Sequence, residues 1–182
     1  MKVYNTSGQL LATATAPPYN KTLVLMAGSS MLPVTKPAVL DQAELAAGAP
    51  NYIYGEYAAG GDEYLQWITE MPTGWDGGNL TLIIDWLTTS ATTNYVKWEL
   101  YAKRFTNNVT LNTALASVTS VEDQNQGASY LNSTTETGAF TVTGTGNFVV
   151  FGLTRIAPTG TTLAAAARVI NMQIKYSTTV TY

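Results

Sequence analysis

The chain has 182 residues, no histidine, no cysteine and only 12% charged residues, with a net charge of −3. It therefore lacks imidazole and thiol groups, which serve in much acid–base catalysis, thiol chemistry and metal ligation. Twelve acidic residues against nine basic ones argue against a nucleic-acid partner, because nucleic-acid-binding domains carry clustered basic residues. The sequence has no apolar run long enough to predict a membrane span.

Residues 1–50 differ from the remainder because they hold five of the seven prolines. Proline lacks a backbone N–H group and disfavours both helices and central strands. Short apolar pieces at residues 23–26 and 31–32 lie between these prolines. We therefore predict an extended N-terminal arm over residues 1–50 that lies on another protein. Residues 41–47 predict one short helix, capped by Asp41 and ended by Gly48.

From Tyr52 onward, apolar residues alternate with polar ones, a period of two that is typical of half-buried β-strands. Glycine, proline, asparagine and aspartate separate the alternating segments and predict turns. The expected strands cover about residues 65–71, 80–87, 96–103, 116–121, 133–143, 148–156 and 170–176. Without long helical segments between them, these strands predict an all-β fold, an antiparallel jelly-roll β-sandwich over residues 51–182.

Three tryptophans and one arginine are expected inside this sandwich. Trp67, Trp86 and Trp98 share their strand faces with aliphatic residues, which places them in the core. Arg155 lies within the apolar segment 148–156. A buried arginine needs a carboxylate or carbonyl partner, so its expected role is structural.

The carboxylates show no catalytic or metal-binding arrangement. Asp62 and Glu63 are adjacent, as are Glu122 and Asp123, and adjacent strand residues point to opposite faces. Asp76 precedes two glycines and is explained as a turn residue. The chain also has no G-x-S-x-G motif. We therefore predict no enzymatic activity, no catalytic residues, no cofactor and no metal site.

The low charge and the many tyrosines predict an interface with another protein. Tyrosine is favoured at interfaces because its ring buries area while its hydroxyl stays hydrogen-bonded. Sugar binding is the alternative explanation for these rings, above all for Trp75 in its turn. The residues predicted to form the interface are Leu23, Val24, Leu25, Met26, Met31, Leu32, Tyr52, Tyr54, Tyr57 and Trp75.

Several short segments together resemble small virion structural proteins of tailed bacteriophages. The first is Met-Pro-Thr-Gly-Trp-Asp-Gly-Gly at residues 71–78, followed by a strand that ends in Asp85 and Trp86. The other segments that carry the resemblance are residues 27–33, 96–98, 118–123, 151–155 and 169–176. Together they cover roughly residues 23–176.

The resemblance implies a jelly-roll domain, a homotrimer and no enzymatic activity. The function that we expect from it is capsid cement or decoration, in which the chain binds over junctions of the major capsid protein and stabilises the shell. The chain would then be made in the host cytoplasm and reside on the capsid surface of the virion. The alternatives are a head-fibre or tail receptor-binding domain, or a carbohydrate-binding module that binds surface carbohydrate.

Overall fold

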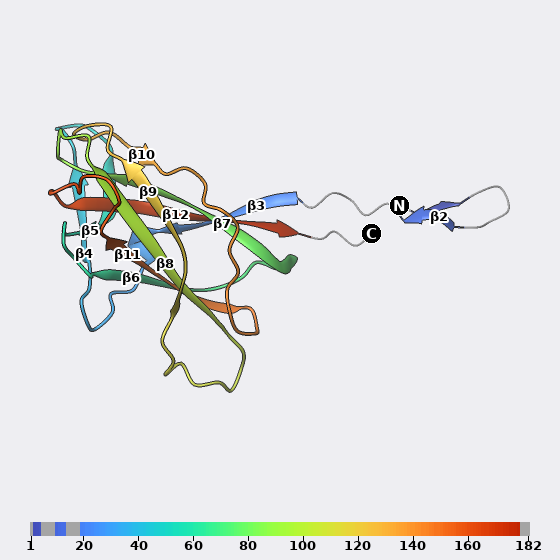
Figure 1. Cartoon of the computed structure of the whole chain (residues 1–182). Coiled ribbons are helices and arrows are strands. Elements are labelled where there is room, and N and C mark those ends of the chain that lie inside the picture. The colour runs from blue at the N-terminus through green and yellow to red at the C-terminus, as the bar shows by residue number, and fades with distance from the viewer. Residues whose placement is uncertain (1, 5–9, 14–18, 179–182) are drawn as a thin grey trace.

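The computed structural model describes residues 2–4, 10–13 and 19–178, with side chains described from residue 21 onward. Two antiparallel sheets pack face to face as a β-sandwich (Figure 1). A single 3-10 turn, η1 (Ala27–Ser29), is the one helical element of the described residues. The predicted all-β antiparallel sandwich is confirmed.

The first sheet is organised around β12 (Ala167–Thr178), which pairs with neighbours along both of its edges. One edge pairs with β7 (Trp75–Leu87), and β7 in turn pairs with β10 (Asn132–Ser133). The other edge is shared between two strands, β5 (Asn51–Tyr57) and β3 (Tyr19–Met26).

The second sheet has the order β6-β11-β8-β9. Its strands are β6 (Tyr64–Glu70), β11 (Phe148–Ile156), β8 (Tyr95–Phe105) and β9 (Ala116–Gln124). Single bridges from Met31 to Gln66 and from Pro37 to Tyr64 place the segment between them along the outer edge of β6. Before both sheets in the chain, β1 (Lys2–Tyr4) and β2 (Leu10–Thr13) pair with each other.

The structure corrects the predicted division at residue 50. Strand β3 pairs with β12 over eight residues, and β4 (Val39–Glu44) pairs with β5 over six, so residues 19–50 belong to the sandwich. Pro33 and Pro37 lie between these strands, where they cost no ladder hydrogen bond. Most of residues 1–18 lie outside the described residues.

The predicted helix at residues 41–47 is wrong. Its first four residues belong to β4, which pairs with β5 from Val39↔Glu56 to Glu44↔Asn51. Helix propensity differs by less than about 1 kcal/mol per residue among ordinary residues, and tertiary pairing routinely outweighs it. The alanine and leucine residues that suggested a helix therefore do not decide the local structure.

The three tryptophans predicted to be internal are buried between the sheets. The rings of Trp86 and Trp98 meet edge to face with centroids 6.1 Å apart, and Tyr57 makes a similar contact with Trp98 at 5.2 Å. The indole N–H of Trp86 donates to Asp123 Oδ2 at 2.8 Å. Burial raises the pKa of Asp123, an effect that this hydrogen bond opposes.

Arg155 is buried, and backbone carbonyls accept its hydrogen bonds. Its guanidinium donates to the carbonyl oxygens of Ala165 at 2.9 Å, Tyr57 at 3.3 Å and Leu163. Burial lowers its pKa to about 10, while nearby Glu63 acts in the opposite direction. The side chain ties β5 and the segment before β12 to β11. Of the two kinds of partner predicted for it, carboxylate or carbonyl, the hydrogen bonds are to carbonyls.

Replacing Trp86 or Trp98 with alanine should destabilise the fold by about 3–5 kcal/mol each, because each change removes a large buried ring. Denaturant unfolding would measure the loss. Tyr130→Ala is the control, because Tyr130 is 62% exposed and should change stability by less than about 0.5 kcal/mol. Losses below about 1 kcal/mol at both tryptophans would contradict the assigned core.

Glu122 should make stability depend on pH. Its carboxylate accepts hydrogen bonds from the backbone N–H of Thr159 at 2.7 Å and of Gly160 at 3.1 Å. The Thr159 bond is the main reason why the pKa of Glu122 lies below its usual 4.5. A lowered pKa stabilises the fold above the unfolded-state value, and this contribution disappears as pH falls through the folded-state value.

Glu122→Gln should therefore melt at a lower temperature than the unmodified chain at neutral pH. The gap between the two melting temperatures should close as the pH falls from about 5 to about 3, because the carboxylate becomes protonated in both states. Thermal unfolding across this range would measure the gap. A gap that does not change with pH would show that the charge of Glu122 does not hold the loop.

Candidate functional site

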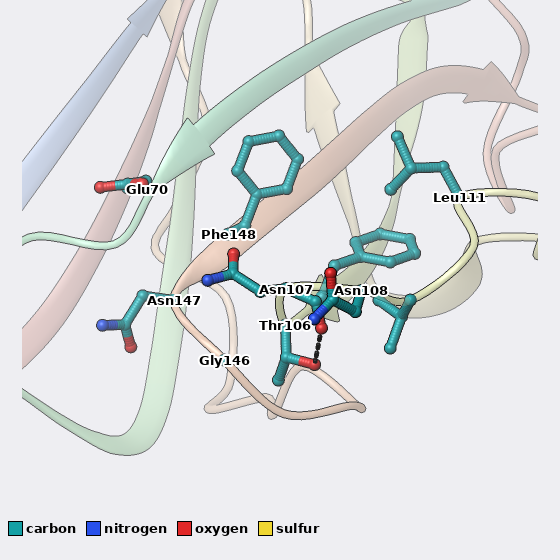
Figure 2. A pocket seen from close by; sticks show the side chains of 10 residues that line it. Glu70, Thr106, Asn107, Asn108, Leu111, Gly146, Asn147 and Phe148 are labelled. Carbon is teal, nitrogen blue, oxygen red and sulfur yellow. Dashed lines mark hydrogen bonds between the residues drawn. The ribbon is translucent and has the colours of Figure 1, made fainter.

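A hollow of about 620 Å³ opens at the end of the second sheet, which we call the loop hollow. The strands supply Glu70 from β6, Phe105 from β8 and Phe148 from β11. The β8–β9 loop and the turn before β11 supply the remaining lining. These lining residues are Thr106, Asn107, Asn108, Val109, Leu111, Gly146 and Asn147 (Figure 2).

Strand register brings the three strand residues of the loop hollow together. Phe148 pairs with Glu70 on one side and with Phe105 on the other, so the three form one row across the sheet. Val149, the next residue along β11, is fully buried in the core. Because successive strand residues point to opposite faces, the Phe148 row lies on the outward face of the sheet.

Two glycines shape the turn that presents Asn147. Gly146 has φ +95°, and a Cβ there would lie 2.2 Å from the carbonyl oxygen of Phe105. Gly144 has φ +100°, and its Cβ would lie 2.4 Å from the carbonyl oxygen of Arg104. Neither position has room for a larger residue, so the turn lies directly against the end of β8.

Arg104 fastens the same turn to β8. Its Nε donates to the carbonyl oxygen of Gly146 at 2.8 Å, and its backbone N–H donates to that of Thr143 at 2.9 Å. The guanidinium also lies over the Trp75 ring, 4.5 Å from the centroid, an attractive cation–π contact. The position of Asn147 therefore depends on hydrogen bonds and packing that form before any ligand arrives.

The lining of the loop hollow combines amide groups with apolar surface. Figure 2 shows Glu70 and Phe148, which lie on strands, together with the loop residues Asn107 and Asn108. Each asparagine amide both donates and accepts hydrogen bonds, whereas an ionised carboxylate only accepts. An uncharged ligand with many hydroxyl groups and an apolar face matches this combination of groups.

The predicted interface residues fall into two groups. Leu25, Tyr54 and Tyr57 are buried within the chain, and the Tyr57 hydroxyl donates to the carbonyl oxygen of Leu153 at 3.2 Å. Their assignment to an interface is corrected, because pairing of β3 and β5 with β12 turns Leu25 and Tyr57 into the core. Leu23 and Trp75 are partly buried and pack against that core.

The other predicted interface residues are accessible. Val24, Met26, Met31 and Leu32 are each 44–49% exposed, and Tyr52 is half-buried. Tyr52 packs beside Tyr54, with ring centroids 5.6 Å apart. A protein interface through the exposed residues stays a prediction.

The carboxylates singled out from the sequence serve separate structural tasks. Asp76 lies at the start of β7 and not in a turn as predicted, but its Oδ1 does accept a local backbone hydrogen bond, from the N–H of Gly78 at 2.7 Å. Glu122 holds the 159–160 loop, and Asp123 accepts the indole N–H of Trp86. In the described part of the chain, no group of three or more acidic side chains is placed to hold a metal ion.

The glycines and the asparagine at residues 144–147 predict a tight turn, but the local sequence does not predict the loop hollow. The glycines and Asn107-Asn108 were visible signals of irregular backbone. Their meeting with Glu70 depends on strand pairing across long stretches of sequence.

Among the described residues, no helix is long and apolar enough to cross a membrane.

No protein-family model and no curated protein sequence matches the chain. Solved structures do show similarity. The CBM36-1 domain of a multidomain xylanase from the hindgut metagenome of Trinervitermes trinervoides matches with a TM-score of 0.50 and 8% identity, over 85% of this chain and 96% of that one. This likeness shows a shared β-sandwich fold.

Two further structures match with lower scores. A family 35 carbohydrate-binding module from Clostridium thermocellum has a TM-score of 0.48 and 15% identity, over 85% of this chain and 97% of that one. The C-terminal CBM6 of LamC from Zobellia galactanivorans has a TM-score of 0.48 and 10% identity, over 85% and 98%.

Gly146→Ala should destabilise the chain more than Gly77→Ala. Both glycines have positive φ, but a Cβ at Gly77 meets nothing within 4 Å, whereas at Gly146 it meets backbone. We expect a loss of about 1 kcal/mol for Gly77→Ala and more than about 2 kcal/mol for Gly146→Ala. Denaturant unfolding of both variants would test this, and equal losses would show that the turn can move away from β8.

Proposed function

We propose that the chain is a carbohydrate-binding module and that its ligand occupies the loop hollow. The observation that carries this proposal is the set of three asparagine amides and one carboxylate that line the loop hollow together with Phe148. Sugar hydroxyls donate and accept hydrogen bonds, as asparagine amides do, and the C–H face of a sugar ring packs on aromatic surface. No catalytic step is assigned to this site.

The fold supports the same proposal. The structure that matches with a TM-score of 0.50 is a domain of a xylanase and belongs to a carbohydrate-binding class by name. At 8% identity this likeness concerns only the fold, so the proposal depends on the residues that line the loop hollow. The alternative drawn from the sequence, sugar binding by a β-sandwich, thereby becomes the main proposal.

A second candidate function is a structural role in a phage virion, as the sequence resemblance implies. The exposed apolar side chains of Val24, Met26, Met31 and Leu32 favour it, because such residues suit a protein contact. The partner expected from the resemblance is the major capsid protein, and the expected assembly is a homotrimer. A domain on the surface of a virion could also bind glycans, so the two functions are compatible.

Asn107→Ala and Asn147→Ala should each weaken polysaccharide binding by about tenfold, because each removes a side chain that donates and accepts. Affinity electrophoresis against xylan, laminarin and soluble cellulose derivatives would identify a bound polymer, and calorimetry would measure the loss. Asn51→Ala is the matched control, since Asn51 is exposed at the start of β5 in the other sheet.

The control should bind like the unmodified chain. Binding that stays unchanged in both Asn107→Ala and Asn147→Ala would move the ligand away from the loop hollow. Failure of the unmodified chain to bind any of a broad panel of polysaccharides would reject the proposed function.

A further inference from the structure

A second hollow lies on the outward face of the same sheet, with a volume of about 330 Å³, and we call it the tyrosine groove. Tyr64 and Gln66 of β6 and Tyr101 of β8 line it. The segment 33–36, which runs along the edge of β6, forms one wall, and Leu115 of the β8–β9 loop forms another.

A glycine lies between the strands that line the tyrosine groove, and it leaves room for Leu115. Gly152 of β11 pairs with Gln66 on one side and with Tyr101 on the other. A Cβ at Gly152 would point toward Leu115 Cδ1, 3.2 Å away, and toward Tyr101 Cβ, 3.7 Å away. A larger residue would therefore press against Leu115 and displace this wall of the groove.

Hydrogen bonds and ring contacts hold the two tyrosines in place. Their ring centroids lie 5.9 Å apart in an edge-to-face arrangement. The Tyr101 hydroxyl donates to Glu99 Oε2 at 2.6 Å, and the Ser117 hydroxyl donates to Glu99 Oε1 at 2.6 Å. The bond to Glu99 raises the pKa of Tyr101, because ionisation would remove this bond and place two negative charges side by side. Rings held in this way lose little conformational entropy when a ligand binds.

The tyrosine groove and the loop hollow lie on one face. Gly152 and Phe148 are four residues apart on β11 and therefore share a face, with their rows about 13 Å apart. Strand β6 presents the partners of both rows, Gln66 and Glu70, with Ile68 between them. Ile68 is 39% exposed, so the path between the two hollows is partly open.

We propose that this outward face binds an extended, uncharged polysaccharide along β6, with one part in the loop hollow and a neighbouring part on Tyr64 and Tyr101. This inference rests on the proposed function and extends it from one pocket to a linear site. The tyrosine rings pack against sugar rings, and the Gln66 amide hydrogen-bonds their hydroxyls. Lys36 lines the groove and forms an ion pair with Asp62. Because this pair neutralises the positive charge, the groove favours an uncharged ligand.

Dependence of affinity on ligand length tests the linear site. Calorimetry would compare disaccharides with hexasaccharides of the xylo-, laminari- and cello- series. For the unmodified chain, the hexasaccharide of the bound series should bind at least about tenfold more tightly than the disaccharide. Tyr64→Ala and Tyr101→Ala should remove most of this gain and leave disaccharide affinity within about twofold.

Two further variants keep the test decisive. Gln66→Ala removes a polar wall without removing a ring, and it replaces the tyrosine variants if their melting shows that they do not fold. It should lower hexasaccharide affinity and spare the disaccharide. Tyr130→Ala removes an exposed tyrosine that lines neither hollow, and it should leave both affinities unchanged.

The remaining outcomes show whether the linear site alone or also the proposed function is wrong. Unchanged hexasaccharide affinity in the groove variants, with disaccharide binding weakened in Asn107→Ala, would overturn the linear site and leave the proposed function intact. Equal loss of both ligands in the groove variants would also overturn it, because a disaccharide would then need the tyrosines. No binding of any sugar by the unmodified chain would reject both proposals.

Discussion

The pairing of β11 with β6 on one edge and β8 on the other determines which side chains of the second sheet face outward. A shift of β11 by one residue relative to both neighbours would exchange its inward and outward faces. Phe151 and Leu153 would then leave the core, and Phe148 and Gly152 would enter it. The core and both hollows therefore depend on one register. Arg155 helps to fix it, because its three carbonyl partners hold the end of β11 against β5 and the segment before β12.

Polar side chains with several partners connect the loops to this frame. Arg104 holds the turn at Gly146, and Glu122 holds the loop at Thr159. Glu99 joins β8 to β9 through its bond to Ser117, and it holds the Tyr101 hydroxyl on its own strand. A chain with 12% charged residues has few such groups. It uses several of them to order irregular backbone and the walls of the tyrosine groove, where one charged group satisfies more than one donor.

Alternation of side chains predicted much of the fold, and it failed where long-range pairing decides. The strands that contain Trp86 and Trp98 were predicted from the period of two in their sequence. Hydrogen-bond partners for Arg155 were predicted because burying an unpartnered charge costs free energy. Strand β4 could not be predicted, because alanine-rich local sequence favours helix and only pairing with β5 overrides it. The loop hollow could not be predicted from the sequence for a similar reason. Phe105 and Phe148 are neighbours only through the register of β8 and β11.

The low charge that first suggested a protein interface also suits an uncharged ligand. Recognition of hydroxyl groups needs paired donors and acceptors, which amides provide without the desolvation cost of a bare charge. The exposed Val24 and Met26 alternate with Leu25, which is buried against Met172, so they lie on the outward face of the first sheet. The two hollows lie on the outward face of the second sheet, and the outward faces of a sandwich are on opposite sides. A polysaccharide bound along β6 would therefore leave Val24 and Met26 free to contact a protein.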